Sequence, residues 1–474
     1  MKLTLAEIAL GCSAKLEAPA SVAGVGALVA QGYSIDSRTI GAGELFFAVR
    51  GPRVDGHDYV VSALQRGALA AVVSLNKLAS LPDAALAAPL IIVEDTLTAL
   101  QGLAGHVRRQ WGKRVIGVTG SAGKTSTKDA VATALGAKFN VLKSLSNLNN
   151  GYGLPLQLLR LEQAHDYAVI EMGMNHAGEI AQLARIAGPD WGVITNVGMA
   201  HVENFSDGQG GIARAKYELV EALPASGVAF LNCDDRYVGQ FGRDFAGKVV
   251  YFGAGPCADP QITGVHDGDG LKIDLLSAGT RATMTLPMLG HHNASNMMAA
   301  LAVAREAGVP LADAIRALET LTAGDRRGEV LVIAGATVIN DSYNSNPEAL
   351  QSMILALAAR PAARRILVAG EMLELGGHAP ELHAACGRAA AKAGIDIVIG
   401  VRGNAEYLVG AAAESGTEGI FLPDAKSAGE WLKSHLNPHD AVLIKGSRGV
   451  RLEQAIDVLR MEEPGGAPVS REAH

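Results

Sequence analysis

One short segment sets strict limits on the fold: Thr119-Gly-Ser-Ala-Gly-Lys124-Thr125-Ser-Thr, directly after a buried strand expected at Val115–Thr119. A glycine-rich turn between a strand and a helix exposes backbone N–H groups that bind phosphate, while the lysine reaches the β/γ oxygens and the threonine hydroxyl ligates Mg²⁺. The loop departs from the general GxxxxGK[ST] pattern because Val118 occupies the first glycine position, and a tight turn with an exposed lysine is the alternative. The pattern favours nucleotide-phosphate binding by Gly120, Ser121, Ala122, Gly123, Lys124, Thr125 and Ser126.

Strands and helix-length segments alternate along most of the 474 residues. Such alternation predicts βαβ units with parallel sheets, so we expect an α/β fold of about three domains. Further buried strands are expected at Tyr167–Met172, Trp191–Asn196, Gly227–Asn232, Ala336–Ile339, Arg365–Ala369, Ile395–Ile399 and Ala441–Ile444. We predict a small α/β domain at 1–95, a central parallel-sheet domain with a β-rich excursion (262–286) at 96–322, a Rossmann-like domain at 323–460 and a disordered tail at 461–474.

The composition excludes several classes of protein. Hydrophobic residues make up 49% and aromatic residues 4% of the chain, which excludes a disordered chain and suits helices packed closely on parallel strands. A net charge of −7 argues against a surface built for nucleic acid or anionic membrane, and no run of 18 apolar residues occurs. Glu7 interrupts the apolar start, which therefore does not resemble a signal peptide. We expect a cytoplasmic monomer that binds neither nucleic acid nor membrane.

The four cysteines, Cys12, Cys233, Cys257 and Cys386, form no CxxC pair. Neither a zinc site nor a redox dithiol is therefore predicted. We expect all of them to be reduced, small and buried, as in a protein from a reducing compartment.

Three residues of the middle third are candidates for chemistry. Glu171 ends the strand YAVIEMG, and a carboxylate there, beside a phosphate loop, suits a magnesium ligand. His201 lies in the loop NVGMAHVENF, where a lone histidine is usually exposed or a structural hydrogen bonder. Lys216 lies in the helix GIARAKYELVEAL, where a solvated lysine is the usual role, but Val220 occupies the ion-pair position four residues on.

Polar loops also follow the strands expected in the last third. The segment GDRRG (324–328) precedes a strand, and DSYNSNP (341–347), GEMLELG (370–376) and KGSR (445–448) each follow one. Asp, Tyr and Asn after a strand suit a nucleotide ribose or a substrate, although turn chemistry selects similar residues. Because two domains carry such loops, we expect a site at their interface.

Together these motifs resemble those of the Mur ligases, the ATP-dependent amide-bond ligases of peptidoglycan synthesis. The similarity covers nearly the whole chain and rests on SIDSRTIGAGELFFAVRG, TGSAGKTST, EMGMNHAGEI, TNVGMAHVENF, AKYEL, GHHNASN, DSYNSNP and KGSRG. The shortened phosphate loop is this family's own form. DSYNSNP and GEMLELGGHAPELH resemble the member that adds D-alanyl-D-alanine to UDP-N-acetylmuramoyl-tripeptide, whereas the member that adds the third peptide residue would carry a DNPR-type motif. Folylpolyglutamate synthetase would not account for the N-terminal DSR segment.

The resemblance implies a nucleotide and metal site in the central domain. Gly120 to Ser126 would bind the ATP phosphates, and Asn293 and Asn296 would bind adenine. Asp341 and Tyr343 would lie near the ribose. Arg327, with Arg326 as the alternative, would contact the γ-phosphate. The catalytic and metal-binding residues of this site would be Lys124 at the β/γ end, Thr125 on one Mg²⁺, Glu171 and His201 at the second metal and acyl-phosphate region, and Lys216 as a carbamylated lysine.

The resemblance also implies substrate contacts and a reaction. Ser37 and Arg38 would hold the UDP-sugar in the first domain, Asn149 and Asn150 would form a substrate-side loop, and Asn344 and Asn346 would face the incoming dipeptide. The product would be UDP-MurNAc-pentapeptide, formed through an acyl phosphate with ATP and Mg²⁺. The competing interpretations are the third-residue-adding ligase, a P-loop kinase and a nucleotide-switched binding protein. The sequence leaves open whether the third peptide residue is diaminopimelate or lysine.

Overall fold

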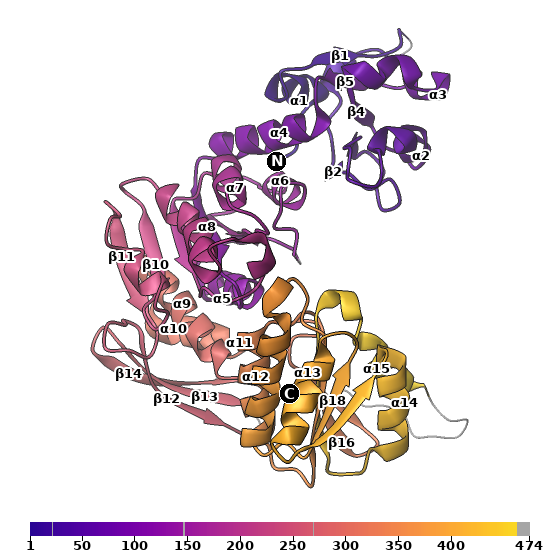
Figure 1. The fold of residues 1–474 in the computed structure, drawn as a ribbon. Helices are drawn as coiled ribbons and strands as arrows, with labels where there is room; N and C mark the ends of the chain where they lie inside the picture. The colour runs from indigo at the N-terminus through magenta and orange to yellow at the C-terminus, as the bar shows by residue number, and fades with distance from the viewer. Residues whose placement is uncertain (21, 146, 269, 462–474) are drawn as a thin grey trace.

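The computed structural model describes residues 1–461 except 21, 146 and 269. Apart from Met461, the predicted disordered tail lies outside the described residues. Figure 1 shows an elongated chain, with the N-terminal sheet at one end, the C-terminal sheet at the other and the central sheet between them. The predicted α/β fold with mainly parallel sheets is confirmed.

The N-terminal sheet has the strand order β1-β5-β4-β3-β2 and is parallel except for the pairing of β1 with β5. Its strands are β1 (Lys15–Glu17), β2 (Tyr33–Ser34), β3 (Leu45–Phe47), β4 (Ala70–Ser74) and β5 (Leu90–Val93). Its helices are α1 (Leu5–Gly11), η1 (Val25–Ala27), η2 (Gly56–Tyr59), α2 (Val60–Gln65), η3 (Leu75–Ser80) and α3 (Asp83–Leu86). Helix α4 (Thr96–Trp111) follows; it contacts α1 on this side and α6 and α7 of the central domain on the other.

The central sheet is parallel throughout, in the order β11-β10-β9-β6-β8-β7. Its strands are β6 (Arg114–Thr119), β7 (Val141–Lys143), β8 (Tyr167–Glu171), β9 (Trp191–Ile194), β10 (Val228–Asn232) and β11 (Lys248–Phe252). The predicted strands in this region are found with shifts of up to two residues at their ends. Because all six strands point the same way, the loops that follow β6, β8, β9 and β10 emerge at one edge of the sheet.

Helices cover both faces of the central sheet. They are α5 (Lys124–Gly136), α6 (Gly153–Leu158), α7 (Glu179–Ala187), η4 (Val202–Asn204), α8 (Gln209–Glu221), η5 (Val238–Gln240), α9 (His292–Glu306) and α10 (Leu311–Leu318). Helix α9 is buried from Met297 to Ala304 and contacts α5, and its many alanines allow that close approach. The predicted β-rich excursion is a separate antiparallel sheet of β12 (Gln261–Asp267), β13 (Leu271–Ser277) and β14 (Thr280–Leu286).

The C-terminal sheet has the order β15-β16-β20-β17-β18-β19, with β15 as an antiparallel edge strand. Its strands are β15 (Glu329–Ile333), β16 (Ala336–Asp341), β17 (Arg365–Gly370), β18 (Ile397–Val401), β19 (Glu418–Leu422) and β20 (Ala441–Lys445). Its helices are α11 (Pro347–Ala358), η6 (Gly376–His378), α12 (Ala379–Lys392), α13 (Ala405–Glu414), α14 (Ala425–His435), η7 (Arg448–Val450) and α15 (Glu453–Arg460). The carboxyl ends of β16, β17 and β20 carry the polar loops noted in the sequence.

The cysteine prediction is wrong for two residues, because Cys233 and Cys257 form a disulfide. Cys233 directly follows β10 and Cys257 lies just beyond β11, and these neighbouring parallel strands bring the two Cα atoms to 6.3 Å. Their separation of 24 residues gave no motif to recognise. Cys386 is buried and free as expected, whereas Cys12 is free but only half-buried.

Among the described residues, no helix has both the length and the apolar character that a membrane crossing requires.

Candidate active site

The phosphate loop is fastened to the end of the neighbouring strand β9. The side chain of Asn196 accepts from the Ala122 N–H (2.9 Å) and donates to the Ala122 carbonyl (3.1 Å), and Thr195 Oγ1 donates to that same carbonyl at 2.6 Å. A Cβ on Gly120 would lie 1.8 Å from Thr195 Oγ1, so only glycine fits there. Gly123, with φ of 79°, then starts α5. These contacts fix the conformation of the loop, and the start of α5 faces the cavity described below.

Lys124 is held inside this loop. Its ammonium donates to the carbonyls of Gly120 (2.7 Å) and Ser121 (3.3 Å). Burial lowers the pKa of Lys124, the Glu171 carboxylate raises that pKa in part, and the charge of Arg327 lowers it further. The lysine therefore lies within the electrostatic reach of a carboxylate from β8 and a guanidinium from the C-terminal domain.

Glu171 has one carboxylate oxygen free to bind a ligand. The side chain is 2% exposed; Oε1 accepts from Asn149 Nδ2 at 2.7 Å, while Oε2 is buried without a hydrogen-bond partner. Its backbone N–H donates to Ser144 Oγ at 3.0 Å, which anchors the end of β8. A buried acceptor without a partner is costly unless a cation or donor completes the site.

A Mg²⁺ ion fits this donor set only with help from a ligand. Glu171 Oε2 and the Thr125 hydroxyl are hard oxygen donors, as Mg²⁺ prefers. Within the described ranges, however, no group of three His, Cys, Asp or Glu side chains is placed to bind a metal. The remaining ligands would be phosphate oxygens and water, which is the usual arrangement for nucleotide-bound magnesium.

Lys216 is an unpaired lysine in the interior. It is 2% exposed on α8, and its ammonium makes no hydrogen bond or ion pair with any residue that the structure describes. Burial lowers its pKa well below the usual value, and the positive charge of Lys124 lowers it further. Both effects favour the neutral amine over the ammonium, and burial excludes the solvated surface lysine considered from the sequence.

The C-terminal domain contributes one arginine of the Arg326–Arg327 pair to the pocket. The Arg327 guanidinium stacks on the Tyr343 ring, 3.9 Å from its centroid, and both residues line the pocket. Arg326 instead pairs with Glu453 at 3.0 Å. The geometry therefore favours Arg327 as the phosphate contact.

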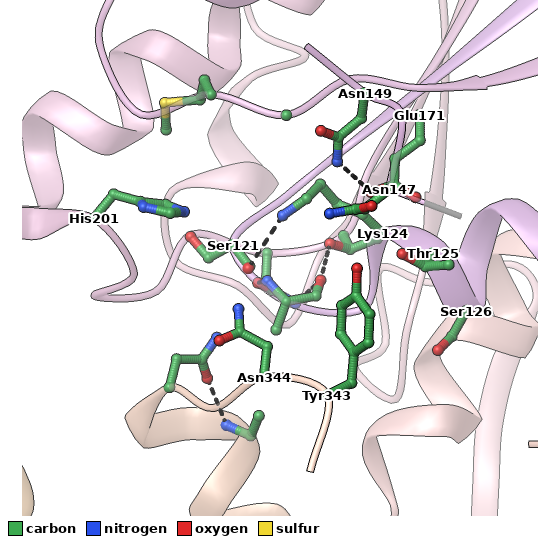
Figure 2. A pocket seen from close by; sticks show the side chains of 18 of the residues that line it. Ser121, Lys124, Thr125, Ser126, Asn147, Asn149, Glu171, His201, Tyr343 and Asn344 are labelled. Atoms are coloured by element: carbon green, nitrogen blue, oxygen red, sulfur yellow. Dashed lines mark hydrogen bonds between the residues drawn. The ribbon is translucent and has the colours of Figure 1, made fainter. Parts of the chain in front are cut away.

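These groups surround one cavity of about 910 Å³ between the central and C-terminal domains. In Figure 2, Lys124 lies at its centre, with Glu171 and Asn149 on one side, His201 on another and Tyr343 entering from the C-terminal domain. The predicted site residues that line it are Ser121, Ala122, Gly123, Lys124, Thr125, Ser126, Asn149, Asn150, Glu171, His201, Asn293, Asn296, Arg327, Asp341, Tyr343, Asn344 and Asn346.

Four predicted site residues lie elsewhere. Gly120 and Lys216 do not line the cavity, although Gly120 shapes the loop and Lys216 is close enough to interact with Lys124. Ser37 and Arg38 follow β2 in the N-terminal domain. The Arg38 guanidinium is 83% exposed and pairs with Asp36 at 2.7 Å, so it is available to a ligand only at that separate surface.

Several of the predicted asparagines also make hydrogen bonds within the protein. Asn346 caps α11 by accepting from the Ala349 N–H (2.8 Å), and Asn150 Oδ1 accepts from the Gly153 N–H at 2.9 Å. Asn293 and Asn296 are buried and bonded to each other at 3.1 Å. Their oxygens are thus partly engaged, and their contribution to a ligand would come through the remaining donors.

The sequence analysis missed several residues at the same edge. Asn232 ends β10 and Asp234 follows it. On the opposite wall of the cavity, in the C-terminal domain, the Lys445 ammonium donates to Asp341 Oδ2 at 2.7 Å. His292 lines the cavity as well, and burial lowers its pKa to about 4, so it is neutral. The signal that could have found Asn232, Asp234 and Lys445 is their place at or just after the carboxyl end of a parallel strand.

Comparisons with known proteins match this arrangement along the chain. Residues 30–108 match the catalytic domain of the Mur ligase family, 118–304 the Mur ligase middle domain and 326–448 the Mur ligase glutamate ligase domain. The UDP-N-acetylmuramoyl-tripeptide–D-alanyl-D-alanine ligase of Bacillus subtilis is 34% identical over 92% of this chain and 94% of its own length. The enzyme of that name from Escherichia coli is 34% identical, over 90% of this chain and 92% of its own.

Solved structures of Mur ligases are also similar to this chain. MurF from Acinetobacter baumannii superposes with a TM-score of 0.85 at 28% identity, covering 97% of this chain and 99% of that one. MurF ligase from Thermotoga maritima in complex with ADP gives 0.79 at 28% identity, covering 90% of this chain and 96% of that one.

The fold and the cavity define a nucleotide-binding α/β enzyme whose phosphate loop faces a second parallel-sheet domain. The three domain matches and the full-length relatives then fix the family: the chain belongs to the Mur ligases and is an ATP-dependent ligase.

Replacing Arg327 with alanine is expected to weaken binding of a non-hydrolysable ATP analogue by about 10- to 100-fold, the cost of one charge-assisted contact, and to weaken ADP binding much less. The reason is that, if Arg327 contacts the γ-phosphate, only the triphosphate would extend to the guanidinium. Isothermal titration of both nucleotides measures the difference, with Arg326→Ala as the matched control because that arginine pairs with Glu453. Equal losses for both nucleotides, or the larger loss in the control, would contradict the assignment.

Proposed function

We propose that this protein joins D-alanyl-D-alanine to the terminal carboxylate of UDP-N-acetylmuramoyl-tripeptide, with conversion of ATP to ADP and phosphate. The product, UDP-MurNAc-pentapeptide, is the last cytoplasmic precursor of peptidoglycan, so the enzyme would act in the cytoplasm in cell-wall growth, cell shape and division. The full-length similarity to enzymes of that name supports the choice of substrates.

One observation carries the proposal. A single cavity brings together Lys124, a buried carboxylate with an unpartnered oxygen at Glu171, and Arg327 from the opposite domain. Phosphoryl transfer requires little more of a protein than positioning and neutralisation of the phosphate charge. The cavity is also large enough for a nucleotide and part of a second substrate.

The reaction would proceed in two displacements. The tripeptide carboxylate attacks the γ-phosphorus, the bond to ADP breaks, and an acyl phosphate forms. The amine of D-alanyl-D-alanine then attacks the acyl carbon, phosphate leaves with the electron pair of the broken bond, and the amine releases a proton. Lys124 and Arg327 would hold the γ-phosphate from opposite sides, while Asn149 keeps the Glu171 carboxylate in place.

The metal and the buried lysine would complete the charge balance. Bound Mg²⁺ would neutralise phosphate charge, with Thr125 as a protein ligand of one ion and Glu171 and His201 at the second ion and the acyl-phosphate region. Lys216 in its neutral form can add CO₂ and lose a proton, giving a carbamate anion. The conversion gives an anion that attracts Lys124 and a metal, whereas the ammonium form would repel both.

Separate domains also suit this chemistry. Ser37 and Arg38 would hold the UDP-sugar, and Asn150 would contact the peptide of the same substrate. Asp341 and Tyr343 would contact the ribose of ATP. Asn344 and Asn346 would contact the dipeptide. Closing the cavity between two domains excludes water, which would otherwise hydrolyse the acyl phosphate. We expect the enzyme to work as a monomer.

Phosphate release is expected only when ATP, Mg²⁺, UDP-MurNAc-tripeptide and D-alanyl-D-alanine are all present, because the acyl phosphate needs both co-substrates to turn over. A coupled phosphate assay with single omissions measures this, and mass spectrometry of products from the diaminopimelate and lysine tripeptides identifies the preferred substrate. A phosphorylated product without free phosphate would indicate a kinase, and nucleotide binding without any product would indicate a switched binding protein. Either result would refute the proposal.

Substituting Lys216 with alanine is expected to lower kcat by at least about 100-fold, because one buried anion at the metal is worth several kcal/mol, and short-chain carboxylates should restore part of the rate. The rate in the phosphate assay, with and without added carboxylate, measures this. Lys392→Ala, which alters an exposed lysine in α12, serves as the control. Normal turnover in Lys216→Ala would show that no carbamate acts there.

A further inference from the structure

The loop at 198–201 lies between the phosphate loop and the C-terminal domain. On its inner side, Ser121 Oγ accepts from the Gly198 N–H at 2.8 Å and lies 3.4 Å from the Gly198 carbonyl. Just before it, the Val197 N–H donates to Asp235 Oδ2 at 2.8 Å. The segment is therefore bonded directly to a residue of the phosphate loop.

Two carboxylates of the C-terminal domain hold the outer side of the same loop. Glu348, at the start of α11, accepts from the Met199 N–H at 3.0 Å. Glu374, in the loop after β17, places Oε2 2.5 Å from His201 Nδ1, a close contact of opposite partial charges that lacks the angles of a hydrogen bond. A Cβ on Gly198 would lie 2.8 Å from the Glu348 carboxylate, so glycine is needed for this approach.

The backbone is strained where the second contact forms. His201 has φ of 65° and Glu374 has φ of 63°, and both are non-glycine residues in the left-handed region. A residue with a side chain is disfavoured in this region and persists there where the surroundings require it. Two strained residues that meet across a domain boundary indicate a contact that the fold is built to make.

We propose that Glu348 and Glu374 are positioning residues that couple docking of the C-terminal domain, through the 198–201 loop, to the alignment of Ser121 and His201 in the nucleotide site. A histidine that serves a metal usually donates its other ring N–H to a carboxylate, which fixes the ring orientation. Here that carboxylate belongs to the opposite domain. Docking of the domains therefore brings this carboxylate next to the ring, where a small rotation of either side chain would complete the hydrogen bond.

The structural arm of the test does not depend on catalysis. Small-angle X-ray scattering would compare the wild type with Glu374→Gln, Glu348→Gln and the double variant, all with ADP and Mg²⁺. Glu381→Gln is the matched control, since Glu381 is an exposed carboxylate of the same domain paired with Arg388. The wild type and the control are expected to match the docked shape, and the double variant is expected to have a larger radius of gyration. Unchanged scattering in the double variant would overturn the proposal.

The kinetic arm rests on the proposed function. Removing a carboxylate that orients such a histidine costs about 10- to 100-fold in metal affinity or activity. Glu374→Gln is therefore expected to lower kcat at least about tenfold and to leave the KM for UDP-MurNAc-tripeptide and the melting temperature unchanged. If Glu374 acts through His201, the double variant His201→Gln/Glu374→Gln loses no more than the worse single variant.

The outcomes separate the two proposals. Two results would show that Glu374 does not act through His201. One is a change in KM without a change in kcat, and the other is a loss of kcat in the His201→Gln/Glu374→Gln variant equal to the product of the two single losses. A wild type that makes no amide product refutes the proposed function, while the scattering comparison still decides whether the two carboxylates hold the domains together.

Discussion

The attachment of the phosphate loop to the end of β9 is the interaction on which the rest of the site depends. Asn196 and Thr195 between them bind both backbone groups of Ala122, and Gly120 fits against Thr195 only because it lacks a side chain. This fixes the start of α5 and the carbonyls that hold Lys124. The anion-binding geometry is therefore a product of strand neighbours in a parallel sheet, and not of the glycine-rich segment alone.

The second requirement is a partner surface for that loop. The central domain supplies Lys124, carboxylates that include Glu171, and several amides, whereas Arg327, Tyr343, Asp341 and Lys445 come from the C-terminal domain. Neither surface neutralises a triphosphate by itself. The net charge of −7 does not exclude an anionic ligand, because Lys124, Arg327 and Lys445 line the cavity itself.

The phosphate loop and the order of strands and helices could be predicted because each depends on neighbours in the sequence, whereas cavity residues such as Asn293 and Arg327 were implied only by the resemblance to Mur ligases. The position of Asp234 and Lys445 at the end of a strand is visible in the sequence, but which cavity they enter depends on which strands lie side by side. The same reason hid the Cys233–Cys257 disulfide. Lys216 was ambiguous because burial, which sets its protonation, is a property of the packed helix.

An isotope experiment tests most directly whether this cavity activates a carboxylate. UDP-MurNAc-tripeptide labelled with ¹⁸O in its terminal carboxylate would be converted with ATP, Mg²⁺ and D-alanyl-D-alanine, and the released phosphate analysed by mass spectrometry. Attack of the carboxylate on the γ-phosphorus predicts one labelled oxygen in each phosphate, because the acyl carbon–oxygen bond breaks in the second step. Unlabelled phosphate alongside the amide product would contradict the account, since it would mean that the carboxylate is never phosphorylated.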